Sequence, residues 1–268
     1  MEALRQIDGW PATTKAAFVL PGADVREVHG PREHVFRWAS VTKLVTTLAA
    51  LIAAEEGVLD LDEPAGPAGS TVRHLLAHAS GLPFEPGGPI GQPGKRRAYS
   101  NVGFETLAAH IADRAEMPFD EYLAAGVLEP LQLRAELRGS AASELHGSLD
   151  DLLAFARELQ RPTLVAPETL AEATSVQFPG LAGVLPDLGR FDPLDWGLGF
   201  ELRDAKEPHW TGTRNSPRTF GHFGGSGTFL WVDPDADVAV GVLTDLDFGD
   251  WAKQAWPELS DAVLAQEA

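Results

Sequence analysis

The sequence predicts an α+β protein, an α/β sandwich in which helices flank an antiparallel sheet built from both ends of the chain. Short apolar runs separated by Gly and Pro near the N-terminus, and two apolar runs joined by the polar turn 233–237, indicate the sheet. Between them, apolar residues recur at helical spacing, which predicts a mostly helical insertion. We expect one domain, 1–268, with an α/β part formed by 1–60 and 196–268 and a mainly helical part formed by 61–195.

Periodicity and capping residues predict the individual elements. Residues 41–54 place apolar or small side chains nearly all round a helix, so this helix is expected to be buried. A second helix opens with Ser148 and Asp151 in the spacing of a capping box, and Pro257 is expected at the first position of the last helix. No element is assigned between 162 and 195. The other assignments are strands at 16–20, 25–29, 35–38, 228–232 and 238–243, and helices at 72–78, 102–114, 118–125, 148–159 and 257–266.

Composition excludes several classes of function. The chain has 21 Lys and Arg against 39 Asp and Glu, a net charge of −18, which would repel nucleic-acid phosphates and anionic membrane surfaces. There is no cysteine, so disulfides, thiolate nucleophiles and zinc–thiolate sites are excluded. The sequence shows neither an export signal nor an apolar run long enough to cross a membrane. We therefore expect a cytoplasmic protein with no nucleic-acid or membrane partner.

A single lysine occupies the most apolar helix. Lys43 is the only charged residue between Arg37 and Glu55, and burying an ammonium group is costly unless it is paired or neutral. A lowered pKa solves the problem and makes the amine a proton acceptor. Ser40 lies one helical turn earlier, so its hydroxyl is expected beside that amine and beside backbone N–H groups able to hold an oxyanion. The alternative is a partly exposed helix in which Lys43 reaches solvent and Ser40 only caps the helix.

Two further segments carry groups suited to the same chemistry. Tyr99 and Asn101 follow a Pro- and Gly-rich loop and open a helix, where they offer a phenol and an amide to one point in space. His222, Gly224 and Gly225 precede the first hairpin strand, where glycine permits close backbone approach and leaves N–H groups free. Each segment alone is also compatible with an ordinary helix cap or glycine-rich turn. The order Ser-x-x-Lys, Tyr-x-Asn, His-x-Gly is more specific.

These motifs, in this order, resemble those of the penicillin-recognising serine hydrolases: class C β-lactamases, D-alanyl-D-alanine peptidases, and a branch of esterases and D-aminopeptidases. The resemblance runs from about residue 35 to the C-terminus and implies a β-lactamase/transpeptidase-like fold. Each of the following segments is similar to a block of that family: 38–44, 71–82, 99–107, 128–131 and 221–243.

The resemblance implies a role for each reacting group. Ser40 would be the nucleophile that forms an acyl-enzyme, and Lys43 would accept or share its proton. Tyr99 would carry protons between Ser40, the leaving group and the deacylating water. The backbone N–H groups of Ser40 and Gly225 would form the oxyanion hole. The resemblance leaves open whether Lys43 or Tyr99 is the base.

Substrate binding is implied for Asn101, which would hold the acyl amide or orient Lys43, and for His222 and Gly224. The third motif departs from the family pattern, because it reads His-Phe-Gly where β-lactamases and transpeptidases usually have Lys-Thr-Gly. A neutral histidine would hold a substrate carboxylate more weakly than a lysine, which favours small esters, D-amino-acid amides or peptides over penicillins. We therefore expect a serine hydrolase acting on a small-molecule ester or amide, with no cofactor and no metal. The alternatives are a true β-lactamase or D,D-peptidase, and a non-catalytic ligand-binding or sensor protein on the same fold.

Three other features have both a functional and a structural interpretation. His74 and His78 have the spacing of metal ligands on a helix, but no third ligand is evident, so structural hydrogen bonds are expected. The basic run 95–97 either holds an anionic substrate group or, as expected, is a solvated loop. Core packing rather than a place in the pocket is the default for three tryptophans, Trp196, Trp210 and Trp231.

Overall fold

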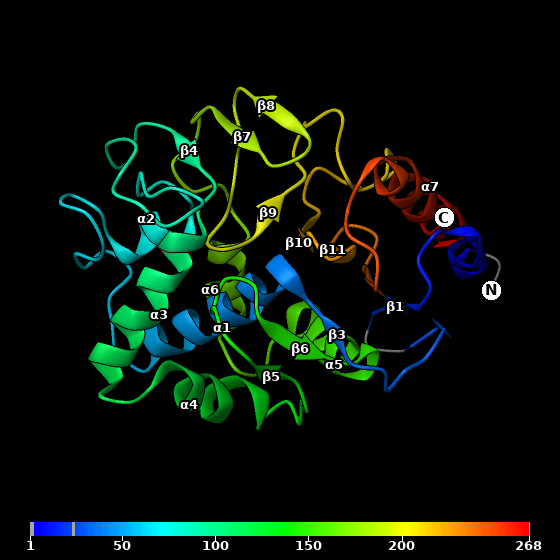
Figure 1. Cartoon of the computed structure of the whole chain (residues 1–268), viewed down its shortest axis with the longest axis horizontal. Coiled ribbons are helices and arrows are strands. Elements are labelled where there is room, and N and C mark those ends of the chain that lie inside the picture. Colours follow the sequence, from blue (N-terminus) through cyan, green and yellow to red (C-terminus); the bar gives the residue numbers. More distant parts are fainter. Residues whose placement is uncertain (1–2, 23–24, 268) are drawn as a thin grey trace.

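A computed structural model of the chain describes residues 3–22 and 25–267 (Figure 1). Its centre is a six-stranded sheet made of β1 (Lys15–Pro21), β2 (Glu27–His29), β9 (Glu201–Leu202), β10 (Phe220–Gly224), β11 (Thr228–Asp233) and β12 (Val238–Thr244). The strand order is β2-β1-β12-β11-β10-β9, and every neighbouring pair is antiparallel. The predicted α+β class, with a sheet assembled from both ends of the chain, is therefore confirmed.

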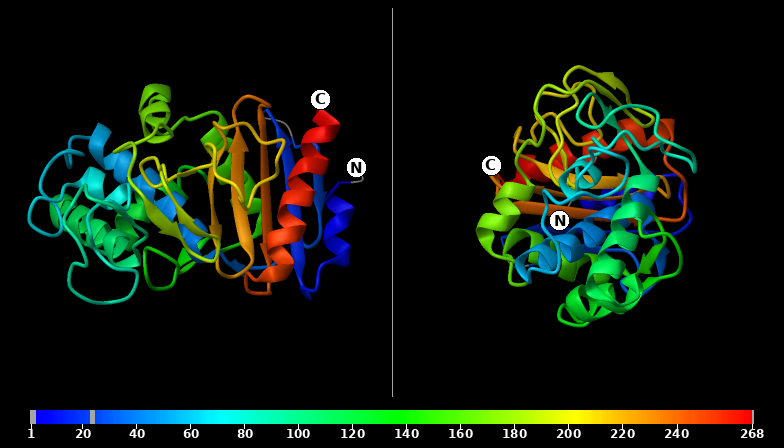
Figure 2. Two further views of the ribbon diagram at one scale, coloured as in Figure 1. Left: turned by 90° about the horizontal axis from the view of Figure 1, so that it is seen from above. Right: turned by 90° about the vertical axis from the view of Figure 1, so that its left-hand side faces the viewer.

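Helices cover both faces of this sheet (Figure 2). On one face, α7 (Asp250–Glu267) and η1 (Leu4–Gly9) pack against alternate residues of β1 such as Ala17 and Val19. On the other face, α5 (Leu149–Gln160) packs against residues such as Phe18. Since both faces are covered, β12 is buried at all its positions, which explains its continuous apolar sequence.

The buried helix predicted from the sequence is α1 (Thr42–Glu55), preceded by the short turn η2 (Ala39–Val41). Residues 42–53 are all buried, which confirms that a helix apolar or small on every side lies inside the protein. It packs between the sheet and a helical layer made of α2 (Val72–Leu76), α3 (Asn101–Ala115), α4 (Phe119–Leu123) and the π-helical turn η3 (Ala124–Leu128).

Two small sheets complete the fold: β3 (Phe36–Arg37), β6 (Leu145–Gly147) and β5 (Glu136–Leu137), and β4 (Arg97–Ala98), β7 (Gly183–Leu185) and β8 (Gly189–Phe191). The expectation that 35–38 belongs to the main sheet was wrong. β3 instead pairs with β6, and Trp38 lies so close to Gly147 that a Cβ there would come within 3.0 Å of the indole ring. The segment 162–195, left unassigned from the sequence, holds α6 (Pro167–Ala173) as well as β7 and β8.

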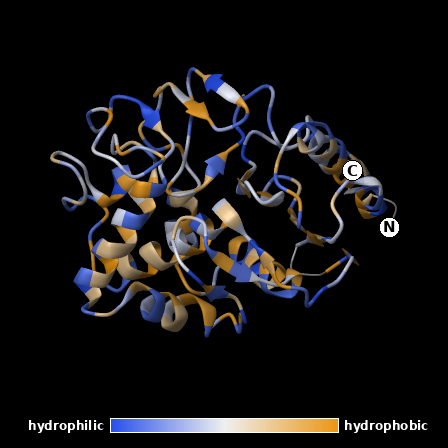
Figure 3. Cartoon of the chain, viewed as in Figure 1, coloured by the Kyte–Doolittle hydropathy of each residue, from blue (hydrophilic) through white to orange (hydrophobic). Residues whose placement is uncertain are grey.

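The prediction that Pro257 starts the last helix was also wrong, because α7 begins at Asp250 and Pro257 lies inside it. One side of α7 carries a stripe of apolar residues that continues through the proline, and Figure 3 shows hydrophobic and hydrophilic residues mixed along this helix. Burial of the stripe outweighs the one backbone hydrogen bond that proline cannot donate. The stripe consists of Ala252, Trp256, Leu259 and Val263.

The capping box at the start of α5 is present as predicted. The Asp151 amide donates to Ser148 Oγ at 3.2 Å, and the Ser148 amide donates to Asp151 Oδ2 at 2.8 Å. We expect Ser148→Ala to lower the free energy of unfolding by about 1 kcal/mol in urea titration, because it leaves a helix N–H without a partner. Ser148→Thr keeps the hydroxyl and should stay within a few tenths of a kcal/mol of the wild type. Equal stability of the alanine variant and the wild type would contradict the cap.

Candidate active site

Ser40 lies in η2, where the chain turns from β3 into α1. The preceding residue, Ala39, has φ of 44°, in the left-handed region that costs a residue with a Cβ about 1 kcal/mol or more. The hairpin holds this turn in place, because Thr228 Oγ1 on β11 donates to the Trp38 carbonyl at 2.9 Å. The strained turn therefore presents the Ser40 hydroxyl at the start of the helix, next to the end of β10.

Lys43 is fully buried on α1, one turn after Ser40. Its Nζ lies 3.2 Å from Ser40 Oγ, 2.6 Å from Asn101 Oδ1 and 2.9 Å from the Ala142 carbonyl oxygen. Burial lowers the pKa of Lys43 from 10.5 to about 7, and only the distant carboxylate of Glu105 opposes this. The alternative in which Lys43 reaches solvent is therefore excluded.

These three contacts suit a group that can exchange a proton with Ser40: an ammonium donates to all three oxygens, and the neutral amine keeps two of these bonds and can accept the third. The Asn101 side-chain oxygen and the Ala142 carbonyl can only accept, so they take both N–H groups of a neutral Nζ. The remaining lone pair then faces Ser40, whose hydroxyl can donate to it. The serine proton is thus directed toward a group able to remove it.

Tyr99 and His222 face each other across the site. His222 Nδ1 lies 2.6 Å from the Phe223 carbonyl, which only accepts, so Nδ1 carries the ring proton and Nε2 is free to accept. The Tyr99 hydroxyl lies 3.3 Å from Nε2 and donates to it. Burial lowers the pKa of His222 to about 4 and raises the pKa of Tyr99, which an interaction with the Ser40 hydroxyl partly opposes. Near neutral pH, His222 is uncharged and Tyr99 keeps its proton.

A cavity of 110 Å³ opens at these groups. Gly225 lines it and has open space where a Cβ would be. Gly224, expected among the substrate-binding residues, does not line it: it is buried, and a Cβ there would lie 2.5 Å from the Trp38 carbonyl. Asn101 is also absent from the lining and is held by Lys43. The lining residues are Ser40, Phe84, Tyr99, Leu185, Pro186, Asp187, His222, Phe223 and Gly225.

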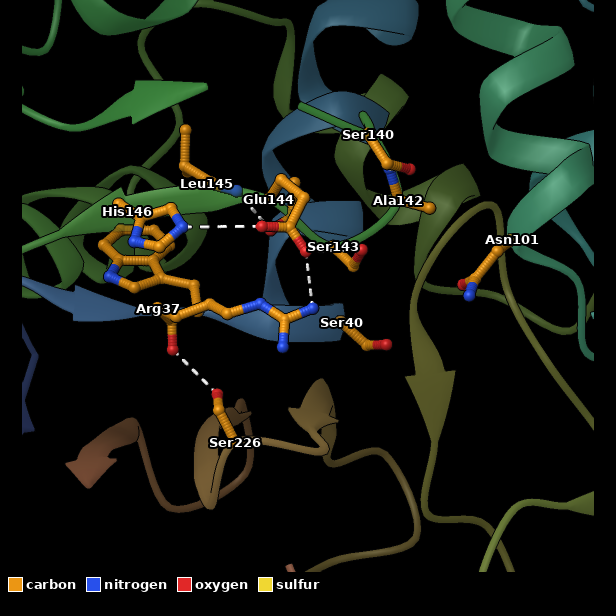
Figure 4. A network of polar contacts seen from close by, with 12 residues as sticks. Arg37, Ser40, Asn101, Ser140, Ala142, Ser143, Glu144, Leu145, His146 and Ser226 are labelled. Atoms are coloured by element: carbon orange, nitrogen blue, oxygen red, sulfur yellow. Dashed lines mark hydrogen bonds and ion pairs between the residues drawn. The ribbon is translucent and has the colours of Figure 1, made fainter. Parts of the chain in front are cut away.

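Sequence reasoning missed the loop that carries Ala142 (Figure 4). A backbone carbonyl has no signature in the sequence, so nothing marked this contact to Lys43. The same view shows an ion pair beside Ser40, in which Arg37 Nη2 lies 2.5 Å from Glu144 Oε1. Ser226 Oγ donates to the Arg37 carbonyl at 2.7 Å, so the hairpin also holds this rim.

The two histidines with metal-ligand spacing make structural contacts. His74 Nδ1 lies 2.9 Å from Thr71 Oγ1, and His78 Nδ1 accepts from the Ser100 amide at 3.1 Å. Residues 3–22 and 25–267 contain no group of three ligating side chains placed to hold a metal ion, and none of the helices in these segments is long and apolar enough to cross a membrane.

The three tryptophans lie in the core. Trp196 packs behind the site with its ring 6.0 Å from that of Tyr99, while Trp210 donates to Glu201 and Trp231 donates to Ser260. None of the three lines the cavity at Ser40.

The burial of Lys43 predicts a pH dependence of stability. Its pKa is about 7 in the folded protein and 10.5 as a free side chain, so between these values the unfolded chain binds more protons and stability rises with pH. We expect the free energy of unfolding of the wild type to rise, relative to Lys43→Met, by up to about 1.4 kcal/mol per pH unit between pH 7 and 10. The control Lys253→Met, at an exposed position on α7, should keep this rise. Parallel stability curves for the wild type and Lys43→Met would contradict a neutral buried amine.

Solved structures of other proteins share the fold of this chain. A beta-lactamase from Mycobacterium bovis is 52% identical in sequence, with a TM-score of 0.97 and coverage of 99% of both chains. EstCE1, described as a hydrolase with promiscuous acyltransferase activity, is 19% identical in sequence with a TM-score of 0.79. The match covers 98% of this chain and 96% of the EstCE1 chain, so the two proteins share the fold.

Among curated proteins, one from Salmonella enteritidis PT4 (strain P125109), provisionally named a D-alanyl-D-alanine carboxypeptidase, is 26% identical over 197 residues. The match covers 57% of this chain and 46% of that protein, so the chain spans about half the length of the curated relatives it matches. The family model described as Beta-lactamase matches residues 15–264, a range that includes Ser40, Lys43, Tyr99 and His222. The chain therefore belongs to the Beta-lactamase family.

Proposed function

We propose that the protein is a serine hydrolase that cleaves a small-molecule ester or amide through an acyl-enzyme on Ser40. One observation carries the proposal: the fully buried Lys43 Nζ lies 3.2 Å from Ser40 Oγ and also donates to Asn101 Oδ1 and to the Ala142 carbonyl oxygen, so a base of lowered pKa stands next to the hydroxyl. A serine with an adjacent base inside a cavity is the arrangement that nucleophilic catalysis requires. A non-catalytic binding protein has no need for such a base.

In the acylation step, Ser40 Oγ forms a bond to the substrate carbonyl carbon while its proton passes to Lys43. The carbonyl oxygen becomes an oxyanion, for which we propose the N–H groups of Ser40 and Gly225 as donors. When the intermediate collapses, the leaving oxygen or nitrogen needs one proton, and Tyr99 supplies it because its raised pKa keeps the hydroxyl protonated. Lys43 has gained the proton that Tyr99 has lost, so the two groups together balance the step.

Deacylation reverses these roles. Water enters the position of the leaving group, gives a proton to Tyr99, and attacks the acyl carbon, after which Ser40 regains its proton from Lys43. The proton transfers at the leaving-group position therefore pass through a phenol whose orientation His222 Nε2 fixes. The sequence left open whether Lys43 or Tyr99 is the base. We propose that Lys43 is the base and Tyr99 the acid, because the pKa of Lys43 is lowered and that of Tyr99 is raised.

Hydrolysis of a β-lactam is the second candidate, favoured by the 52% identity to the Mycobacterium bovis beta-lactamase. Against it, the third motif offers a neutral, hydrogen-bonded His222 and no cation for a substrate carboxylate. Turnover of nitrocefin in place of simple esters would favour the β-lactamase over the esterase or amidase. The cytoplasmic location stays a prediction.

The first test of the proposal is covalent labelling. A fluorophosphonate probe should add one adduct to the wild type, located at Ser40 by intact-mass and peptide spectrometry. Ser40→Ala should remain unlabelled, whereas Ser143→Ala should be labelled like the wild type, since the hydroxyl of Ser143 donates to Glu144 and is not among the hydrogen-bond partners found for Lys43 in the described part of the chain. An adduct elsewhere, or none, would count against an acyl-enzyme on Ser40.

A second test is the pH–rate profile for a p-nitrophenyl ester. Because Lys43 must be unprotonated to accept the serine proton, kcat/KM should rise with pH through about 7 and then level off. Lys43→Met should lose at least about 100-fold in activity together with this inflection. Tyr99→Phe should lose about 100-fold or more toward an amide substrate, whose leaving nitrogen needs a proton, and less toward the p-nitrophenyl ester, while the inflection remains. If Lys43→Met kept the wild-type rate and profile, Lys43 would not be the base.

A further inference from the structure

A second, larger pocket of 520 Å³ adjoins the catalytic cavity. The two share Phe84, Tyr99 and Pro186, and the rings of Phe84 and Tyr99 stack with their centroids 5.8 Å apart. A group attached to a carbonyl carbon held at Ser40 can therefore extend past these rings into the second pocket. It is lined by Phe84, Ile90, Lys95, Arg96, Arg97, Ala98, Tyr99, Ala182, Gly183, Val184, Pro186 and Arg190.

Part of the lining of this pocket is apolar and accessible. Phe84, Ile90 and Val184 are 44%, 54% and 56% exposed, and they are three of the seven large hydrophobic residues that are exposed in the described part of the chain. Exposed apolar side chains that gather around a pocket indicate a ligand surface. These three side chains fit a hydrocarbon segment.

The lining also contains four basic residues and no carboxylate, in a chain whose net charge is −18. The buried Arg97 is a structural residue, since its guanidinium donates to the carbonyls of Ala77, Gln177 and Leu194. Arg96 donates to the Ile90 carbonyl at 2.7 Å and so holds the loop.

Lys95 and Arg190 are both exposed, and no hydrogen bond or ion pair of their side chains is found within residues 3–22 and 25–267. Arg190 on β8 lies directly opposite Val184 on β7, so a cation and an apolar side chain stand on the same face of this small sheet. Figure 3 shows hydrophobic colour on β7 and, beside it, hydrophilic colour on part of β8.

We propose that this pocket is a subsite for an apolar segment ending in an anionic group, which Phe84, Ile90 and Val184 cover and which Lys95 and Arg190 bind. The proposal rests on the proposed function and names its substrate class: esters or amides that carry a carboxylate, or a similar small anion, at the end of a hydrocarbon or aryl segment. The cation absent from the third motif is thus supplied from another part of the site.

Two matched pairs of esters test the subsite on either side of the scissile bond. For the acyl side, p-nitrophenyl hydrogen adipate is compared with p-nitrophenyl hexanoate, and for the leaving-group side, 4-carboxyphenyl acetate with phenyl acetate. We compare the wild type with the double variant Lys95→Gln/Arg190→Gln. In this variant, kcat/KM for the anionic ester of at least one pair should fall about fivefold or more, whereas kcat/KM for the neutral ester of that pair should fall less than about twofold. Higher ionic strength should likewise reduce the preference of the wild type for the anionic ester over the neutral one. The control Lys253→Gln, on α7, should change neither member.

Two readouts separate this proposal from the proposed function. Ser40-dependent turnover in which the double variant affects charged and neutral esters alike would overturn the subsite and leave the hydrolase intact. If Ser40→Ala left the turnover of every ester unchanged, the proposed hydrolase function would be wrong. The subsite would then be tested by calorimetry, which compares the binding of 4-phenylbutanoate with that of 4-phenylbutanamide. Tighter binding of the carboxylate that the double variant abolishes supports the subsite, and equal binding of both compounds overturns it.

Discussion

Burial of a single amine is the constraint on which the centre of this molecule depends. Within residues 3–22 and 25–267, the hydrogen-bond partners of Lys43 Nζ are the amide oxygen of Asn101, the carbonyl of Ala142 and the hydroxyl of Ser40, and none of them is a carboxylate. A carboxylate at that distance would favour the charged form, whereas uncharged acceptors satisfy the N–H groups and leave the lone pair available. The apolar helix that excludes water from Lys43 therefore also determines its protonation state.

The remaining architecture brings distant segments to this amine. Ser100 caps α3 by accepting from the Gly103 amide at 2.8 Å, which places Tyr99 just before the helix and Asn101 at its first position. β10 delivers His222 from the opposite side, and its pairing with β11 fixes the depth at which the ring lies. Three elements separated by long stretches of sequence thus meet because strand β10, the start of α3 and the buried helix α1 pack together.

Much of this could be predicted from the sequence, because the deciding signals are local. A helix without a polar side predicts its own burial, and one charge within it predicts a perturbed pKa, as α1 and Lys43 show. Signals that depend on tertiary packing were missed. The Ala142 carbonyl leaves no trace in side-chain identity, Gly224 serves close packing against Trp38, and Pro257 is tolerated because its neighbours bury an apolar stripe. The basic run 95–97 divides into one structural arginine and two exposed cations, which no periodicity distinguishes.

The pairing of β1 with β12 has a consequence for biosynthesis. Lys15 lies opposite Thr244, so these two neighbouring strands of the main sheet join residues more than two hundred positions apart. During translation the first strand leaves the ribosome long before β12 exists, and the edge of β1 that pairs with β12 stays unpaired until β12 has been made. The helical insertion can form earlier, but Ser40 and His222 come together only after this late pairing.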